Sequence, residues 1–171
     1  RENDIIHRDI KSDNVVYNVH TGKIKYIDFG LMTSKTELIK NCQTNTEPRA
    51  HSHSYWPPEN SCTNKRVFYF DNAKCRNLRN NFASHAIFLE KATTSFDSYC
   101  LTYALVKLFS YISTNKLIKG FNIFFNSFKP ILMTYCEKNI VIRETDMHKL
   151  KAAYIEALKK NYLYPTTLVT P

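Results

Sequence analysis

An almost uninterrupted apolar stretch between Tyr99 and Ile112 constrains the fold of this chain more than any other part of the sequence. Its apolar side chains fall on nearly every side of a helix rather than on one stripe, which is typical of a helix that is central and buried. Apolar patterns predict two further helices, at about 117–136 and 146–160. The region 97–160 therefore predicts one packed helical core, which suits a chain of 171 residues.

The first part of the chain has the patterns of strands and loops instead. Residues 15–17 are β-branched and aromatic, residues 23–27 alternate polar and apolar, and turn residues ending in Gly22 join them, which predicts a small hairpin. Residues 31–56 are polar and without period, so they predict a loop. Residues 57–59, Pro-Pro-Glu, favour a helix start. The predicted fold class is mainly α (α+β).

The glycine content excludes a glycine-rich phosphate loop, and the distribution of charge argues against a nucleic-acid-binding domain. The chain has only three glycines, Gly22, Gly30 and Gly120, and glycine-rich phosphate loops need clustered ones. The formal charge of +9 comes wholly from residues 60–171, because residues 1–59 have equal numbers of basic and acidic side chains. The basic residues are scattered, which favours a solvated face. A nucleic-acid partner is unlikely, since it needs clustered Arg and Lys beside stacking aromatics.

The cysteines and the hydropathy pattern bear on the compartment. Five widely spaced cysteines without a C-x-x-C pair predict reduced thiols in an intracellular, cytoplasmic protein. A zinc site can be drawn from four residues whose spacing matches no standard ligand pattern, namely Cys42, His51, His53 and Cys62. No leader and no apolar run long enough to span a bilayer are present, so we expect no membrane partner.

Two polar motifs give the strongest functional signal. Residues 7–14 read His-Arg-Asp-Ile-Lys-Ser-Asp-Asn, and residues 28–30 read Asp-Phe-Gly. They resemble the catalytic loop and the magnesium-binding motif of eukaryotic-type protein kinases, H-R-D-L-x-x-x-N and D-F-G. Residues 55–59 resemble the A-P-E segment of that family, with proline in place of alanine, and residues 96–101 resemble the start of its central helix. The four motifs in order cover residues 5–113.

This resemblance implies that residues 1–171 are a partial serine/threonine kinase domain, the C-terminal lobe, with a mainly helical fold and a hairpin at the active cleft. The segments would be an activation segment at 28–59, a basic insertion at about 60–95 and a helical remainder at 97–160. ATP and Mg²⁺ are the implied cofactors. The implied partners are a protein substrate and an N-terminal lobe that is missing from this chain.

The chemistry of phosphoryl transfer assigns a role to each polar residue, because that reaction mainly needs positioning and charge neutralisation. Asp9 would accept the proton of the substrate hydroxyl, and Lys11 would place an ammonium against the migrating phosphoryl group. Asn14 and Asp28 offer hard oxygen ligands for Mg²⁺. By resemblance, Val16 would touch the adenine base. The assignment requires the side chains of Asp9, Asn14 and Asp28 to converge on one small patch open to solvent.

Other residues have regulatory roles by resemblance. Arg8 would pair with a phosphate on the activation loop, because guanidinium–phosphate pairs are favourable. Ser52 would bond Asp9 and Lys11, and lysine at position 11 favours the serine/threonine class. The candidate phosphate acceptors stay open: Thr33, Ser34, Thr36, Thr44, Thr46, Ser52 and Ser54.

A third group of residues has structural roles by resemblance. Asp97 would hold the backbone of the catalytic loop as a buried acceptor, with a plain helix N-cap as the alternative. Glu59 would pair with Arg143 and brace the activation segment. His7 and Phe29 are interpreted as packing residues rather than chemical ones.

Two questions stay open at this point. The basic insertion is interpreted as a disordered surface segment, with a docking segment as the alternative. The kinase function has a rival in a non-catalytic, pseudokinase-like binding module that scaffolds partners through this insertion.

Overall fold

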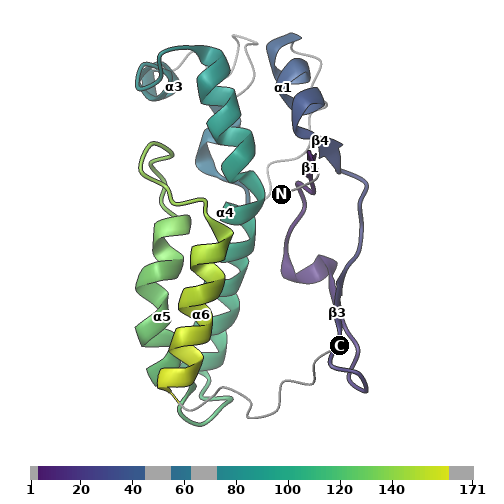
Figure 1. The fold of residues 1–171 in the computed structure, drawn as a ribbon, viewed down its shortest axis with the longest axis vertical. Helices are drawn as coiled ribbons and strands as arrows, with labels where there is room; N and C mark the ends of the chain where they lie inside the picture. Colours follow the sequence, from purple (N-terminus) through teal and green to yellow (C-terminus); the bar gives the residue numbers. More distant parts are fainter. Residues whose placement is uncertain (1–3, 45–54, 63–72, 162–171) are drawn as a thin grey trace.

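The computed structural model describes residues 4–44, 55–62 and 73–161, and it is mainly helical (Figure 1). Three long helices form a bundle: α4 (His85–Thr114), α5 (Phe121–Tyr135) and α6 (Met147–Lys160). The preceding elements are, in order, β1 (Ile5–Ile6), the 3₁₀ turn η1 (Ser12–Asn14), β2 (Val15–Tyr17), β3 (Ile24–Tyr26), β4 (Thr33–Ser34), α1 (Lys35–Thr44), the 3₁₀ turn η2 (Pro58–Cys62) and α3 (Ala73–Arg79).

The strands form two separate antiparallel pairs. In the first, β1 pairs with β4, which joins the start of the chain to the segment before α1. In the second, β2 pairs with β3, with Val16 opposite Lys25, so the predicted hairpin is confirmed. Its turn is closed by the Asn18 side chain, whose Oδ1 accepts from two backbone N–H groups, and by Gly22 at φ +67°. Residues 7–14 connect the two pairs.

Helix α4 begins twelve residues earlier than predicted. Ser84 caps it by accepting a hydrogen bond from the backbone N–H of Ile87 at 3.2 Å, and Phe88 and Leu89 bury its first turns in the core. The interpretation of residues 60–95 as a disordered insertion is therefore wrong for residues 73–79 and 85–95, which are helical.

The burial of α4 changes along its length. Within the stretch 99–112, where burial was predicted, only Tyr99, Cys100 and Thr102 at its start are buried. The second half of the helix is not buried all round, because Leu108 is 47% and Tyr111 62% exposed. There the helix packs through one face, which includes Phe109, against α5. The prediction of burial all round is thus wrong for this half.

The predicted loop at 31–56 contains a helix. Residues 35–44 form α1, which packs on α4 and buries Leu38 and Cys42. The Ser34 hydroxyl accepts from the backbone N–H of Glu37 at 3.0 Å and caps its first turn. With only two buried positions, the helix leaves too weak an apolar period to recognise in the sequence.

The buried side chains form two clusters. One lies between α1, the start of the chain around Ile6 and Ile10, and the first half of α4. The other lies among α4, α5 and α6 and is built on aromatic rings, with the Tyr154 ring of α6 edge-on to Phe124 at a centroid distance of 5.8 Å. The helices predicted at 117–136 and 146–160 are confirmed as α5 and α6, although α5 starts at Phe121.

The prediction of reduced thiols is wrong for two cysteines. Cys62, at the end of η2, forms a disulfide with Cys75 in α3, whereas Cys42, Cys100 and Cys136 are free and buried. The disulfide removes Cys62 from the drawn zinc site, and His51 and His53 lie outside the described residues. Among the described residues, no group of three or more His, Cys, Asp and Glu side chains is arranged to hold a metal ion.

In the part of the chain that the structure describes, no helix combines the length and the apolar character needed to cross a bilayer.

Candidate active site

The half-buried carboxylate of Asp97, in α4, anchors the loop at residues 7–14. Asp97 accepts a hydrogen bond from the backbone N–H of His7 at 2.8 Å through Oδ2 and from that of Arg8 at 3.0 Å through Oδ1. The bonds bridge about ninety positions of sequence, so they fix the loop to the bundle. Asp97 lies in the middle of a helix, so the N-cap alternative is wrong and the role of backbone acceptor is confirmed.

Asp9 is the centre of the polar cluster. Its Oδ2 accepts from Nζ of Lys11 at 3.0 Å and from Nδ2 of Asn14 at 2.7 Å. Asn14 also donates to the backbone oxygen of Asp9 at 2.9 Å, because the turn η1 brings it back over the loop. Asp9 is only 7% exposed, and hydrogen bonds from a charged donor and an amide donor offset the cost of burying a carboxylate.

The hairpin brings Asp28 next to this cluster. The backbone N–H of Ile27 donates to the backbone carbonyl oxygen of Asn14 at 2.9 Å, and Asp28 is the next residue along the chain. Its Oδ1 accepts from the backbone N–H of Gly30 at 3.2 Å, and the residue is exposed. A Cβ at Gly30 would lie 3.3 Å from the same oxygen, so glycine leaves room for this turn.

Two residues of the cluster have a backbone conformation that is rare for L-amino acids. Arg8 has φ +67° and Asp28 has φ +60°. Such conformations are held in place by their surroundings and gather at functional sites. The Arg8 peptide is held from both sides, by Asp97 through its N–H and by Trp56, whose Nε1 donates to its carbonyl at 2.9 Å. Nothing in the sequence indicates this contact, because it joins residues that are 48 positions apart.

Aromatic packing holds the two motifs together. The His7 ring lies 5.1 Å from the Phe29 ring and 5.8 Å from the Tyr26 ring. The predicted packing of His7 is confirmed, whereas Phe29 packs on His7 through part of its ring and is 54% exposed. Burial, followed by the negative charge of Asp97, raises the pKa of Tyr26 above its ordinary value.

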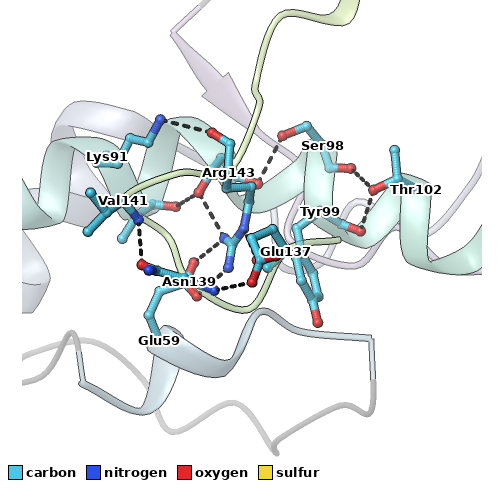
Figure 2. A network of polar contacts seen from close by, with 11 residues as sticks. Glu59, Lys91, Ser98, Tyr99, Thr102, Glu137, Asn139, Val141 and Arg143 are labelled. Carbon is cyan, nitrogen blue, oxygen red and sulfur yellow. Dashed lines mark hydrogen bonds and ion pairs between the residues drawn. The ribbon is translucent and has the colours of Figure 1, made fainter. Parts of the chain in front are cut away.

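A buried ion pair braces the segment that follows. Arg143 donates to both oxygens of Glu59, at 2.5 and 2.8 Å, and both residues are almost fully buried (Figure 2). It also donates to the Glu137 carbonyl at 2.7 Å, and its guanidinium lies 4.6 Å from the centre of the Tyr99 ring. The predicted pairing of Glu59 and Arg143 is confirmed. Such a pair tolerates burial because its donors and acceptors are satisfied.

A row of packed aromatic side chains leads from this ion pair to the exposed Lys107. The ring of Tyr99 is stacked on that of Tyr103, and Tyr103 meets Tyr55 edge to face. The ammonium of Lys107 lies 4.8 Å from the Tyr55 ring and 4.9 Å from the Tyr103 ring. Contacts of this kind hold the segment at 55–59 on α4. No signal in the sequence pointed to Lys107.

Burial dominates the electrostatics beneath the cluster. The pKa of the Cys100 thiol is raised well above its ordinary value, first by desolvation and then by the negative charges of Asp97, Glu59 and Asp9. The thiol therefore stays protonated at neutral pH and is a packing residue rather than a nucleophile.

The structure thus joins Asp9, Lys11 and Asn14 by side-chain hydrogen bonds and ties Asp28 to them through the backbone. The expected patch open to solvent is wrong for Asp9 and Asn14, which are 7% and 6% exposed, whereas Asp28 is exposed. Lys11 points to Asp9 itself, which the sequence did not predict. Val16 is 44% exposed on the hairpin, and Ser52 lies outside the described residues. The chemical roles of these residues, with ATP and Mg²⁺, stay predictions.

Comparisons with known protein families, with curated proteins and with solved structures found no match for this chain.

Proposed function

We propose that this chain is the C-terminal lobe of a serine/threonine protein kinase that transfers the γ-phosphoryl group of ATP to a protein hydroxyl. The observation that carries the proposal is the convergence of Lys11 and Asn14 on one carboxylate oxygen of Asp9. The loop that holds them is fixed to the bundle by Asp97 and is in contact with the strand that leads to Asp28. A chance polar loop would not need this set of supports.

In this proposal Asp9 orients the substrate hydroxyl and accepts its proton. Lys11 neutralises the charge of Asp9 while the site is empty. During transfer it neutralises the charge of the phosphoryl group. The rigid supports matter because phosphoryl transfer depends on positioning. Val16 and the exposed face of the hairpin would cover the base of the nucleotide, which a second lobe would enclose from the other side.

The donor set suits Mg²⁺. Both hydrogen bonds of the Asn14 side chain use Nδ2, so its Oδ1 is available as a ligand, and Asp28 keeps Oδ2 apart from the bond to Gly30. Oxygen atoms from a carboxylate and an amide are ligands that Mg²⁺ prefers. Asn14 and Asp28 would hold the metal, which would supply positive charge to neutralise the phosphates of ATP.

The test joins the chain to an N-terminal kinase lobe and measures phosphate transfer to a generic protein substrate. We expect transfer to serine or threonine, and a loss of at least about a hundredfold in Asp9→Asn, because a positioned acid–base group contributes that much. Asp13→Asn is the matched control, since Asp13 is an exposed carboxylate of the same loop.

The pseudokinase alternative gives a different result in the same assay. Nucleotide binding without transfer, with Asp9→Asn equal to the unaltered protein, would favour a non-catalytic binding module and overturn the enzyme proposal.

A further inference from the structure

The end of the helical bundle has a loop that is both basic and apolar. Residues 116–119, between α4 and α5, read Lys-Leu-Ile-Lys, and all four are exposed. Helix α6 finishes with Lys159 and Lys160 at the same end of the bundle (Figure 1). We call residues 116–119 with Lys159 and Lys160 the basic tip. The predicted helix at 117–136 is wrong for residues 117–120, because α5 begins only at Phe121.

The loop has a defined backbone rather than an irregular one. The N–H of Lys116 donates to the carbonyl of Ser113 at 3.3 Å, and that of Leu117 donates to the carbonyl of Ile112 at 3.1 Å. This is the Schellman pattern of a helix C-terminus. Lys116 occupies its left-handed position at φ +52°, where glycine is usual. The Lys116 side chain is exposed, so burial of this side chain does not explain why a lysine takes the left-handed position.

The apolar side chains of the loop face outward. In a Schellman motif the residue at the position of Leu117 commonly packs back on the helix, yet Leu117 is 58% exposed and Ile118 50%. Loop ends are normally polar, because they face water. Two adjacent aliphatic side chains at the end of the bundle therefore indicate a contact with something apolar.

The charges around the loop are of one sign. No Asp or Glu occurs between residues 98 and 136, whereas four lysines do, at 107, 116, 119 and 129. The carboxylate nearest to the end of α6 on that helix is Glu156. Lys116 and Lys119 thus lie in a segment of one charge sign, which favours an anionic surface.

We propose that the basic tip docks the protein on an anionic lipid bilayer, with its lysines at the headgroups and Leu117 and Ile118 entering the interface. Basic residues beside exposed aliphatic ones are typical of contact with a membrane surface. Nucleic acid fits less well, since the tip has no arginine and no aromatic side chain to stack on bases. The expectation of no membrane partner rested on spanning and leader signals, which do not report a peripheral contact.

The test measures sedimentation of the 171-residue chain with vesicles. Vesicles of equal parts phosphatidylserine and phosphatidylcholine should bind it, vesicles of phosphatidylcholine alone should not, and added salt should weaken binding. The double variant Lys116→Gln/Lys119→Gln should bind at least about tenfold more weakly, as each lysine near the surface accounts for about fivefold. The matched control is Lys138→Gln/Lys151→Gln, which removes two exposed lysines beyond the tip and should bind normally.

A second pair of variants tests the apolar part. Leu117→Ser/Ile118→Ser keeps the charge and should lose the binding that remains at high salt. The proposal is overturned if the mixed vesicles do not bind, if both lysine pairs weaken binding equally, or if the serine variant binds as well as the unaltered chain. Tighter binding to an oligonucleotide or to a polyglutamate peptide, with the same dependence on Lys116 and Lys119, would also overturn it. None of these results depends on the kinase proposal.

Discussion

At the scale of single residues, the described chain has three non-glycine residues with positive φ, and all three lie where a function is proposed. Arg8 and Asp28 flank the polar cluster of Asp9, Lys11 and Asn14, and Lys116 lies at the basic tip. Each conformation costs free energy that the surroundings must supply. At Arg8 the supports are visible as hydrogen bonds from its peptide to Asp97 and Trp56, whereas at Lys116 only the helix end itself holds the turn.

Replacing Asp97 with asparagine tests the anchoring of the catalytic loop. The amide has one oxygen, so one of the two N–H groups of His7 and Arg8 loses its acceptor, and unfolding should become easier by about 1–3 kcal/mol. Urea unfolding measures this, and hydrogen exchange at the two amides should accelerate locally. Asp13→Asn is the control. Unchanged exchange in Asp97→Asn would contradict the anchoring role.

Replacing Lys116 with glycine should stabilise the protein. Glycine adopts the left-handed conformation without strain, so the free energy of unfolding should rise by about 1 kcal/mol. Lys119→Gly, in the same loop but without a positive φ, should instead lower it. A loss of stability in Lys116→Gly, measured by urea unfolding, would mean that the lysine makes a contact that stabilises the fold.

At the scale of elements, the turns and loops are fixed by side chains far away in sequence. The turn η2 is held at one end by Glu59 on Arg143 and at the other by the disulfide from Cys62 to Cys75. Arg79 of α3 adds two hydrogen bonds to the carbonyl of Cys62. These links position the segment beside the catalytic loop.

The buried pair of Glu59 and Arg143 should be strongly coupled. Glu59→Gln or Arg143→Gln alone should lower the free energy of unfolding by about 3–5 kcal/mol, because each leaves a buried charge without its partner. The double variant should lose much less than the sum of the two. In the pair of Lys149, which is exposed, and Glu144, which is half-buried, the same cycle should give a much weaker coupling, because solvent screens the charges. Additive losses at Glu59 and Arg143 would contradict the coupling.

The start of α6 should be sensitive to acid. Hydrogen bonds to Glu144 from the N–H groups of Asp146 and Thr145, and then from Lys149, lower its pKa from 4.5 to about 2. A lowered pKa gives stability that is present above pH 4.5 and is lost as the pH falls toward 2. Glu144→Gln should lose this part of the acid dependence in urea unfolding curves, by a small amount because solvent screens the charge. Glu156→Gln, which changes a carboxylate inside α6, should keep the acid dependence that Glu144 causes.

At the scale of the whole molecule, the candidate site lies on one side of a helical bundle. Strand β1, α1 and the loop at residues 7–14 contact α4, whereas α5 packs on another part of that helix and α6 packs on α5. The hairpin of β2 and β3 lies away from the bundle (Figure 1). Several large apolar residues of the hairpin region are exposed, among them Tyr17, Ile24 and Phe29. This surface is compatible with the second lobe that the proposed function requires.

The chain on its own should therefore bind ATP weakly and phosphorylate nothing. The described residues supply only the floor of the proposed cleft, and ATP needs contacts from both sides to be positioned. The measurement is incorporation of labelled phosphate by the purified 171-residue chain. Robust ATP-dependent phosphorylation that is lost in Asp9→Asn would show that no second lobe is needed.

Where local chemistry decides structure, the sequence was enough. The hairpin follows from the residues at 15–17 and 24–26 and their turn, and α5 and α6 follow from their apolar patterns. The polar motif at 7–14 already placed Asp9 and Asn14 on one short loop. Hydrogen bonds over two to five residues then bring their side chains together, so this part of the site could be predicted.

The tertiary structure decided what depends on partners that are distant along the chain. Helix α1, the early start of α4 and the disulfide exist because neighbouring segments bury or pair them, and a local pattern cannot show such neighbours. The exposure of Leu117 and Ile118 was hidden for the same reason, since an apolar residue is buried only where another element covers it. The sequence by itself determined the residues of the site and the short loop that unites them, whereas only the fold determined which surfaces stay open.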